Sequence, residues 1–446
     1  MEFIGFLSSI GGVLNFVIAL SIIVAVHEFG HYIVGRWSGI HSEVFSLGFG
    51  PALWSRVDKR GTRWQIAALP LGGYVKFLGD ADAASAPDGQ AIAVLSDAQR
   101  RRTMHGAPLW ARVLTVAAGP VFNFIFAIVI IFGFGLLHGA AVDTPTIDFV
   151  KPLPTATESL RSGDRIVALA GQPTPDNAAF IAVADALPPA PTVEYVVLRD
   201  GSELTVQGPY PFPPLADGVQ PTSAAMNAGL LAGDVITAID GAPVHAFSEI
   251  RTRVEASAGS DLRLTVWRAG PDEGGTTFDV TLQPKRVDLP LEEGGFETRW
   301  LIGLTGGLFF QHETRALGLV EAATNSVART WGVITTSLSF LGHIIVGNVS
   351  SCNLSGPIGI YEVTSDAGSQ GIEAFIQIIV QLSIAVGLMN LFPIPVLDGG
   401  HLVFHAYEAV TGRPPSDRAL RVLMGAGLVL LLALMTFALT NDVFCP

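Results

Sequence analysis

Two histidines and a glutamate stand inside an otherwise apolar stretch near the start of the chain, in the segment AVHEFGHYIVG at residues 25–35. On a helix, residues four apart project from nearly the same face, so His27 and His31 can direct two imidazole nitrogens to one metal ion. Glu28 lies about 100° around the helix from His27 and can reach a water activated by that ion. This H-E-x-x-H spacing is typical of hydrolytic zinc sites, where the glutamate acts as the general base.

The position of Glu28 within an apolar stretch strengthens this interpretation. A carboxylate near the centre of a membrane-spanning helix costs roughly 2.5 to 3.5 kcal/mol or more. A neighbouring divalent cation and its water offset that cost, because the carboxylate is then no longer an isolated buried charge. The alternative is that His27 and His31 only pack between helices, but polar residues at membrane depth are rare unless they have a function.

A catalytic zinc needs a third protein ligand and one open position. The other apolar segments offer His343, His401, His405 and Asp398. Asp398 is favoured because it follows two prolines and precedes two glycines in NLFPIPVLDGGHLVF (390–404). Irregular backbone of this kind is tolerated at membrane depth where it lines a protein cavity or water. His401 remains the competing ligand.

The composition places this site in an integral membrane protein. Of 446 residues, 49% are hydrophobic and only 15% are charged. Stretches at about 10–34, 112–137, 375–396 and 418–440 are long and apolar enough to cross a bilayer, which takes about 20 helical residues. The first stretch has neither a basic start nor a small-residue cleavage site, so we expect a retained helix and not a signal peptide.

Basic residues set the expected orientation. They gather between the first and second stretches and again between the last two, and by the positive-inside rule both connections are cytoplasmic. The segment 36–111 is therefore predicted to be cytoplasmic, with the N-terminus, the central region and the C-terminus outside. The residues concerned are Arg36, Arg56, Lys59, Arg60, Arg63, Lys76, Arg100, Arg101, Arg102, Arg112, Arg413 and Arg418.

The central region is acidic. Residues 143–311 hold 22 acidic and 11 basic side chains, which accounts for most of the net charge of -13. Such a balance argues against nucleic acid as a partner. The two cysteines, Cys352 and Cys445, are too few and too distant in sequence to indicate a disulfide framework or a thiolate metal site.

The central region also contains an internal repeat. LRSGDRIVALAGQP (160–173) aligns with LLAGDVITAIDGAP (230–243), and each copy has a Gly-Asp turn that leads into an alternating strand. The copies predict two small α+β domains at 143–208 and 217–287, joined by a proline-rich linker, and both resemble PDZ domains. PDZ domains bind an extended peptide as an added edge strand. Alternatively, the pair only obstructs access to the membrane part.

Two further segments complete the expected organisation. Residues 42–80 alternate apolar and polar positions around the turn DKRG, which predicts a membrane-associated β-hairpin or sheet. Residues 317–347 are amphipathic and then apolar, so they are expected to lie at the membrane interface or to span it in part. The fold class is thus a polytopic α-helical membrane protein with about four spanning helices, a β-hairpin and two PDZ-like domains. The remaining divisions are 1–142, with HExxH and the hairpin; 288–350, connecting and amphipathic; and 351–446, with the last two spans.

Several ordered motifs together resemble the site-2 protease family of intramembrane zinc metalloproteases, over nearly the whole chain. They are HExxH at 27–31, FSLGFGPALW, LPLGGYVK, AAGPVFNFIFA (117–127), the two PDZ-like copies, NLSGPIGI (353–360) and N-x-x-P-x-P-x-L-D-G at 390–399.

The resemblance implies a function and its residues. It implies one zinc ion per chain, held by His27, His31 and Asp398, with Glu28 as the general base. It further implies that Asn390 engages the substrate backbone and that the strand Ser46, Leu47, Gly48, Phe49 and Gly50 pairs with an extended substrate.

The implied setting is regulated intramembrane proteolysis in a bacterial stress response. The substrates would be single-span membrane proteins, an anti-sigma factor already trimmed on its external side in particular, and remnant signal peptides. The enzyme would be a multi-pass protein of the bacterial inner membrane, with the PDZ-like pair in the periplasm facing the external part of the substrate.

Two other classes compete with an intramembrane protease. A catalytically inactive PDZ scaffold or membrane chaperone is expected to lack at least one of His27, Glu28, His31 and Asp398, and all four are present. A transporter would use charges at membrane depth for ions and would rarely need an external peptide-binding pair. The sequence therefore favours the protease.

Overall fold

The computed structural model describes residues 2–81, 89–154, 159–270, 274–291 and 295–444, which divide into two compact units. The first unit contains the described parts of 1–132, 323–342 and 354–445, and the second contains those of 133–322 and 343–353. All residues of the expected metal site belong to the first unit.

Within the described residues, four helices are long and apolar enough to cross a membrane, as the sequence predicts. The third ends earlier than expected, because Pro393 and Pro395 cannot continue a helix and the chain turns at 391–397 before the next helix begins. The four helices are α1 (Glu2–Trp37), α4 (Leu109–His138), α10 (Ile372–Asn390) and α12 (Asp417–Phe444).

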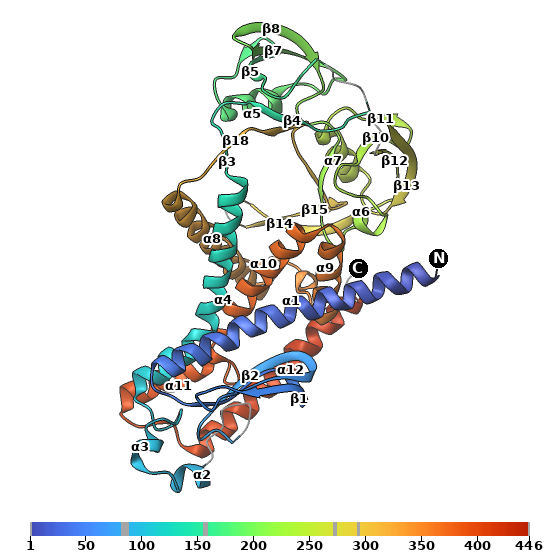
Figure 1. Ribbon diagram of the computed structural model, residues 1–446. Coiled ribbons are helices and arrows are strands. Elements are labelled where there is room, and N and C mark those ends of the chain that lie inside the picture. The colour runs from blue at the N-terminus through green and yellow to red at the C-terminus, as the bar shows by residue number, and fades with distance from the viewer. Residues whose placement is uncertain (1, 82–88, 155–158, 271–273, 292–294, 445–446) are drawn as a thin grey trace. The chain divides into compact units, whose positions relative to one another are not determined.

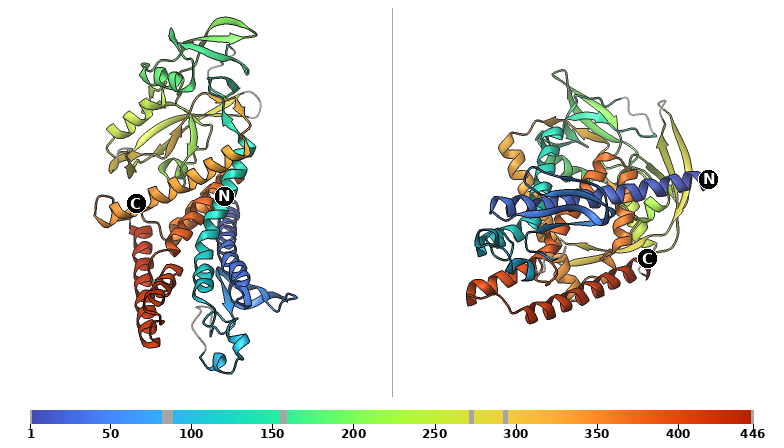
Figure 2. Two further views of the ribbon diagram at one scale, coloured as in Figure 1. Left: turned by 90° about the vertical axis from the view of Figure 1, so that its left-hand side faces the viewer. Right: turned by 60° about the horizontal axis from the view of Figure 1, so that its bottom comes forward.

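Helices α1 and α4 approach very closely, and both views of Figure 2 show them together. Glycines on both sides permit the contact: a Cβ at Gly30 would lie 2.5 Å from the carbonyl oxygen of Ala118, and a Cβ at Gly119 would lie 2.2 Å from His31 Nε2. Small residues at such a crossing let backbones pack without large side chains between them. The crossing therefore brings α4 against the histidines of α1.

The predicted hairpin is present as β1 (Ser42–Val57) and β2 (Arg63–Phe77), which lie beside the C-terminal part of α1 (Figure 1). Both strands bend, so residues 44–47 pair with 73–76 on one side and with 63–66 on the other. Phe45, Val75 and Phe77 pack with Tyr32 of α1 and Val116 of α4 in one buried cluster. The sheet is thus anchored to the two helices that carry the site.

Shorter helices complete the first unit. They are α2 (Gly89–Ala93), α3 (Asp97–Arg100), α9 (Pro357–Ser369) and α11 (Asp398–Thr411). Helix α9 starts at the motif NLSGPIGI, and Asp442 of α12 accepts hydrogen bonds there from the backbone nitrogens of Gly356 (2.7 Å) and Ile358 (3.0 Å). Helix α8 (Leu319–Ile345) is one continuous helix over most of the segment 317–347 and is not among the four candidate spans.

The interpretation of the cysteines is wrong for Cys352, which follows α8 in a short 3₁₀ turn at Ser351–Asn353 and is disulfide-bonded. The other cysteine of the chain, Cys445, lies outside the described residues. Spacing in the sequence failed here because distance along the chain does not limit distance in the fold.

The second unit holds the sequence repeat as two sheets of the same strand order, seen in green and yellow-green in Figure 1. The first sheet runs β6-β5-β7-β8 and the second β11-β10-β12-β13. The first copy comprises β5 (Arg165–Leu169), β6 (Gln172–Pro173), α5 (Asn177–Ala186), β7 (Val193–Arg199) and β8 (Ser202–Gly208). The second comprises α6 (Ala224–Asn227), β10 (Val235–Ile239), β11 (Ala242–Pro243), α7 (Phe247–Ala256), β12 (Leu262–Ala269) and β13 (Gly275–Leu282).

One ion pair recurs in both copies and ties the Gly-Asp turn to the sheet. Asp164 receives hydrogen bonds from Arg199 Nε (2.7 Å) and Nη2 (2.6 Å), and Asp234 receives them from Arg268 Nε (2.6 Å) and Nη2 (2.7 Å). Both carboxylates are almost fully buried. The aspartate that the two sequence repeats share thus makes the same ion pair in both copies.

Short strand pairs connect the repeats with the ends of the unit. These are β3 (Ala140–Ala141) with β18 (Thr314–Arg315), β4 (Ile147–Val150) with β17 (Phe310–His312), β9 (Ala216–Val219) with β16 (Leu304–Gly306), and β14 (Lys285–Pro290) with β15 (Phe296–Leu301). The connecting segment 288–350 therefore begins as strands and becomes helical only at α8.

Candidate active site

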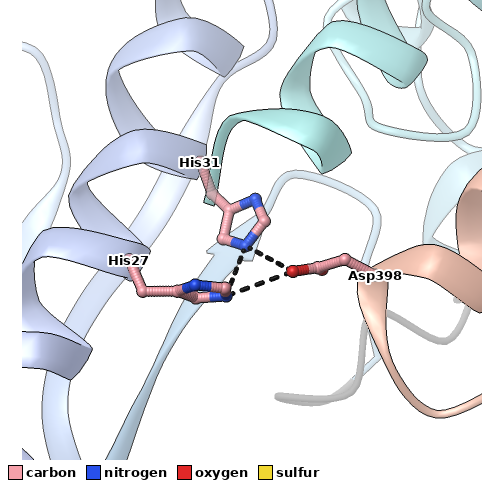
Figure 3. A group of neighbouring side chains, drawn as sticks. All are labelled: His27, His31 and Asp398. Carbon is pink, nitrogen blue, oxygen red and sulfur yellow. Dashed lines mark hydrogen bonds and ion pairs between the residues drawn. The ribbon is translucent and has the colours of Figure 1, made fainter. Parts of the chain in front are cut away.

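His27 and His31 face the same side of α1, and Asp398, the first residue of α11, points at both of them (Figure 3). The two Nε2 atoms are 3.2 Å apart. Asp398 Oδ2 lies 3.1 Å from His27 Nε2 and 3.4 Å from His31 Nε2. Among the described residues, these three side chains form the group of histidine and carboxylate ligands that could hold a metal ion.

The three distances fit zinc. In a tetrahedral site with bonds of about 2.1 Å, neighbouring ligand atoms are about 3.4 Å apart. The buried Oδ2 of Asp398 has no hydrogen-bond donor among the described residues apart from the two imidazoles. Two nitrogens and one carboxylate oxygen leave the fourth position open, as in catalytic zinc sites.

The turn before α11 explains how Asp398 reaches the histidines. A Cβ at Gly399 would lie 2.3 Å from the carbonyl oxygens of Leu391 and Phe392, and one at Gly400 would lie 2.3 Å from that of Ile394. Any larger residue would therefore push the loop away from the start of α11. The Gly-Gly pair lets the chain fold tightly after α10 and deliver Asp398 to the site.

Helix α4 supplies the next layer of contacts. His31 Nδ1 lies 2.8 Å from the carbonyl oxygen of Thr115, and the amide of Asn123 lies 3.3 Å from His27 Nδ1. Asn123 is completely buried. Thr115 and Asn123 were not among the predicted site residues, although a lone asparagine in an apolar span is a signal that could have identified the latter.

Glu28, His401 and His405 line one cavity of about 240 Å³ with the three candidate ligands, whereas His343 of α8 belongs to the second unit. Gly73 of β2 lies against Glu28, since a Cβ there would be 3.2 Å from Glu28 Cγ. Asn390, the last residue of α10, also lines this cavity, as does His401. His401 is one turn beyond Asp398 on α11 but does not belong to the ligand group.

Two of the five strand residues that were expected to pair with substrate already pair with backbone on both sides. Ser46 and Leu47 pair on both sides, with Tyr74 and Gly73 and with Gln65 and Ile66, so they have no free edge for a substrate. Gly48, Phe49 and Gly50 occupy the bend that follows. The part of the hairpin that lines the cavity is 73–75 and 77, in β2. The alternation of apolar and polar residues does not distinguish the two halves of the hairpin in this respect.

The chain is similar to known metalloproteases over nearly its whole length. A model of peptidase family M50 matches residues 15–434. A protein of Agrobacterium fabrum whose name assigns it to the zinc metalloproteases is 35% identical over 98% of this chain and 97% of the relative. The regulator of sigma-E protease RseP of Escherichia coli is 32% identical over 98% of this chain and 99% of the relative, and that of Salmonella typhimurium is 33% identical over the same shares.

Proposed function

The chain belongs to peptidase family M50 and is a zinc metalloprotease, and from this membership we propose that it cuts peptide bonds inside the transmembrane segments of single-span membrane proteins. The convergence of His27, His31 and Asp398, with Glu28 in the same cavity, carries this proposal. The two histidines and Glu28 lie on a candidate spanning helix, so the reaction takes place at membrane depth.

The metal and the side chains of the site have separate roles in the proposed hydrolysis. His27, His31 and Asp398 would hold zinc, which would supply a Lewis acid for the scissile carbonyl and would lower the pKa of a bound water to about 7. Glu28 accepts a proton from that water as its oxygen adds to the carbonyl carbon. Glu28 then donates the proton to the nitrogen of the leaving amine as the carbon–nitrogen bond breaks. Both products form without a covalent enzyme intermediate.

The substrate helix must unwind before it is cut, because its carbonyls are hydrogen-bonded internally and its freed backbone groups need partners. We assign strand addition to residues 73–77 of β2, which pair with β1 on one side and line the cavity at 73–75 and at 77. Phe49 and Gly50 would contact the substrate from the adjoining bend. Asn390 adds a side-chain amide to the substrate backbone, and its Nδ2 lies 3.0 Å from the carbonyl oxygen of Val386 in the structure.

The two repeats of the second unit are proposed to act as PDZ-like domains on the external part of the substrate. Their support is the shared strand order and the recurring buried ion pair. They would limit access to substrates that have already lost a bulky external domain, an anti-sigma factor above all, or remnant signal peptides. The division into PDZ-like domains at 143–208 and 217–287 is part of the same proposal.

The proposed orientation has independent support from Cys352. Disulfides persist in oxidising compartments such as the bacterial periplasm and are rare in the cytoplasm. The disulfide-bonded Cys352 therefore supports an external location for the turn between α8 and α9. This agrees with a cytoplasmic segment 36–111 and a periplasmic second unit in a protein of the inner membrane.

The variant Glu28→Gln tests the proposed chemistry. It is nearly isosteric and leaves the three ligands in place, so the protein should insert, bind zinc and bind substrate. Cleavage of a single-span substrate in lipid vesicles should fall by about 10² to 10⁴-fold or more, because the general base is lost. Normal turnover by Glu28→Gln would rule out the role assigned to Glu28.

A further inference from the structure

The two candidate zinc-binding histidines differ in the group that contacts their Nδ1 atoms, and this group decides which ring nitrogen carries the proton. A histidine that binds zinc through Nε2 carries its proton on Nδ1, and this N–H normally donates to an oxygen. For His31 the acceptor is present, since Nδ1 lies 2.8 Å from the carbonyl oxygen of Thr115. For His27 the neighbour of Nδ1 is the side-chain amide of Asn123, at 3.3 Å.

The amide of Asn123 has one end without a partner. Its Nδ2 faces His27 Nδ1, while its Oδ1 is buried with no hydrogen-bond partner among the described residues. The two ends of an amide are nearly the same size, so a half-turn of the side chain places Oδ1 in the same space. In that orientation Oδ1 accepts the Nδ1–H of His27.

Helix α10 holds Asn123 where it can serve this purpose. Ser383 Oγ donates a hydrogen bond to the backbone oxygen of Asn123 at 3.1 Å. A Cβ at Gly387 would lie 3.2 Å from Asn123 Cβ, so α10 packs directly against this residue. Asn123 is fully buried, and its amide therefore cannot leave His27 for solvent.

We propose that Asn123 is a positioning residue of the zinc site, which accepts the Nδ1 proton of His27 and so fixes the tautomer that binds zinc through Nε2. With the carbonyl of Thr115, it makes α4 the outer layer for both histidines of α1. The proposal rests on the zinc site of the proposed function, but it concerns the affinity for metal and not the cleavage reaction.

Zinc affinity of the full-length protein, measured by competition with a chromogenic chelator in the absence of substrate, tests the proposal. Asn123→Leu keeps the volume and removes the acceptor, and it should weaken zinc binding about 10 to 100-fold. Asn123→Asp supplies an obligate acceptor and should retain wild-type affinity or exceed it. Asn390→Leu is the matched control, because Asn390 lines the cavity of the candidate ligands but its amide contacts the carbonyl oxygen of Val386 and not a histidine, and this variant should leave zinc affinity unchanged.

The results separate this role from others. If Asn123 only packed between helices, Asn123→Leu would keep its affinity for zinc and Asn123→Asp would destabilise the protein, which overturns the proposal. If Asn123 touched substrate, KM would change and zinc affinity would not. Should Asn123→Leu fail to fold, a tenfold loss of zinc affinity in Asn123→Asp would still contradict the proposal. Because no substrate is present, failure of the proposed cleavage reaction would not affect these outcomes.

Discussion

Asp398 differs from the two histidines because it arrives from another helix, more than 360 positions along the chain. A carboxylate is a common third ligand for zinc beside two histidines. His401 is one turn further along α11, lines the same cavity and was the competing ligand in the sequence. Substitutions of Asp398 and His401 can therefore show directly which of them is the third zinc ligand.

Elemental analysis of purified variants distinguishes these ligands. We expect about one zinc per chain in the intact protein, a large loss in Asp398→Ala and near-normal content in His401→Ala, because only Asp398 reaches the two histidine nitrogens. Zinc retained in Asp398→Ala but lost in His401→Ala would reverse the assignment. Residual zinc in both single variants but none in the double variant would show that either residue suffices.

The spacing of residues along the chain explains which site residues could be predicted from the sequence. His27, Glu28 and His31 lie within one helical turn or so, and the 3.6-residue period alone places them on one side. Asp398 could be favoured because prolines and glycines mark irregular backbone. The two-sided pairing of Ser46 and Leu47 and the contact between Asn123 and His27 depend on which segments pair or cross in space. That information is not present in local periodicity.

At the scale of elements, the position of α11 relative to α4 decides whether Asp398 completes the site. Arg112 and Glu408 join the two helices by a two-pronged ion pair, with Nη1–Oε2 at 2.8 Å and Nη2–Oε1 at 2.6 Å. Glu408 is ten residues beyond Asp398, or about 15 Å along the helix. The pair therefore holds the far end of α11 while the Gly-Gly turn holds its start.

Burial and charge indicate how strongly this pair acts. Only 14% of the Arg112 side chain and 17% of that of Glu408 are exposed. Hydrogen bonds from Arg112 hold the pKa of Glu408 below its usual range. A lowered carboxyl pKa adds stability above the ordinary glutamate pKa of about 4.3, and that stability is lost as the pH falls through the folded-state pKa. The pair is thus intact at neutral pH.

Removal of either charge, and exchange of the two charges, test whether Arg112 and Glu408 act as a pair. Glu408→Gln or Arg112→Gln should each destabilise the protein by roughly 2 kcal/mol, between the values for surface and buried pairs. Each should also lower zinc affinity, because α11 is then free to shift. The double variant Arg112→Glu with Glu408→Arg should regain much of the lost stability and of the lost zinc affinity. Thermal unfolding in detergent measures the first, and chelator competition measures the second.

The exposed Arg413, just beyond α11, is the matched control, and Arg413→Gln should change neither quantity. If the double reversal behaved like the sum of two independent losses, the two residues would not act as a pair.

At the scale of the whole molecule, most of the second unit is one continuous segment, residues 140–315, whose two ends pair with each other. The chain leaves α4 at His138, and β3 pairs with β18 just before α8 begins. The backbone nitrogen of Val142 donates to the oxygen of Glu313 at 2.9 Å. Residues 143–312 can therefore be replaced by a short turn between these two neighbours, and no candidate zinc ligand is removed.

This replacement tests whether the repeats act as a gate. If they exclude bulky external domains, the shortened enzyme should keep its zinc and should cut untrimmed single-span substrates that the intact enzyme spares. If they instead deliver substrate by strand addition, cleavage of trimmed substrates should slow as well. Leu231→Asp in the exposed GLLAGD loop of the second repeat should then reproduce that slowing, while Leu204→Asp on β8 of the first repeat serves as its control. Paired assays with trimmed and untrimmed forms of one substrate separate the two roles, and unchanged selectivity and rate after the replacement would exclude both.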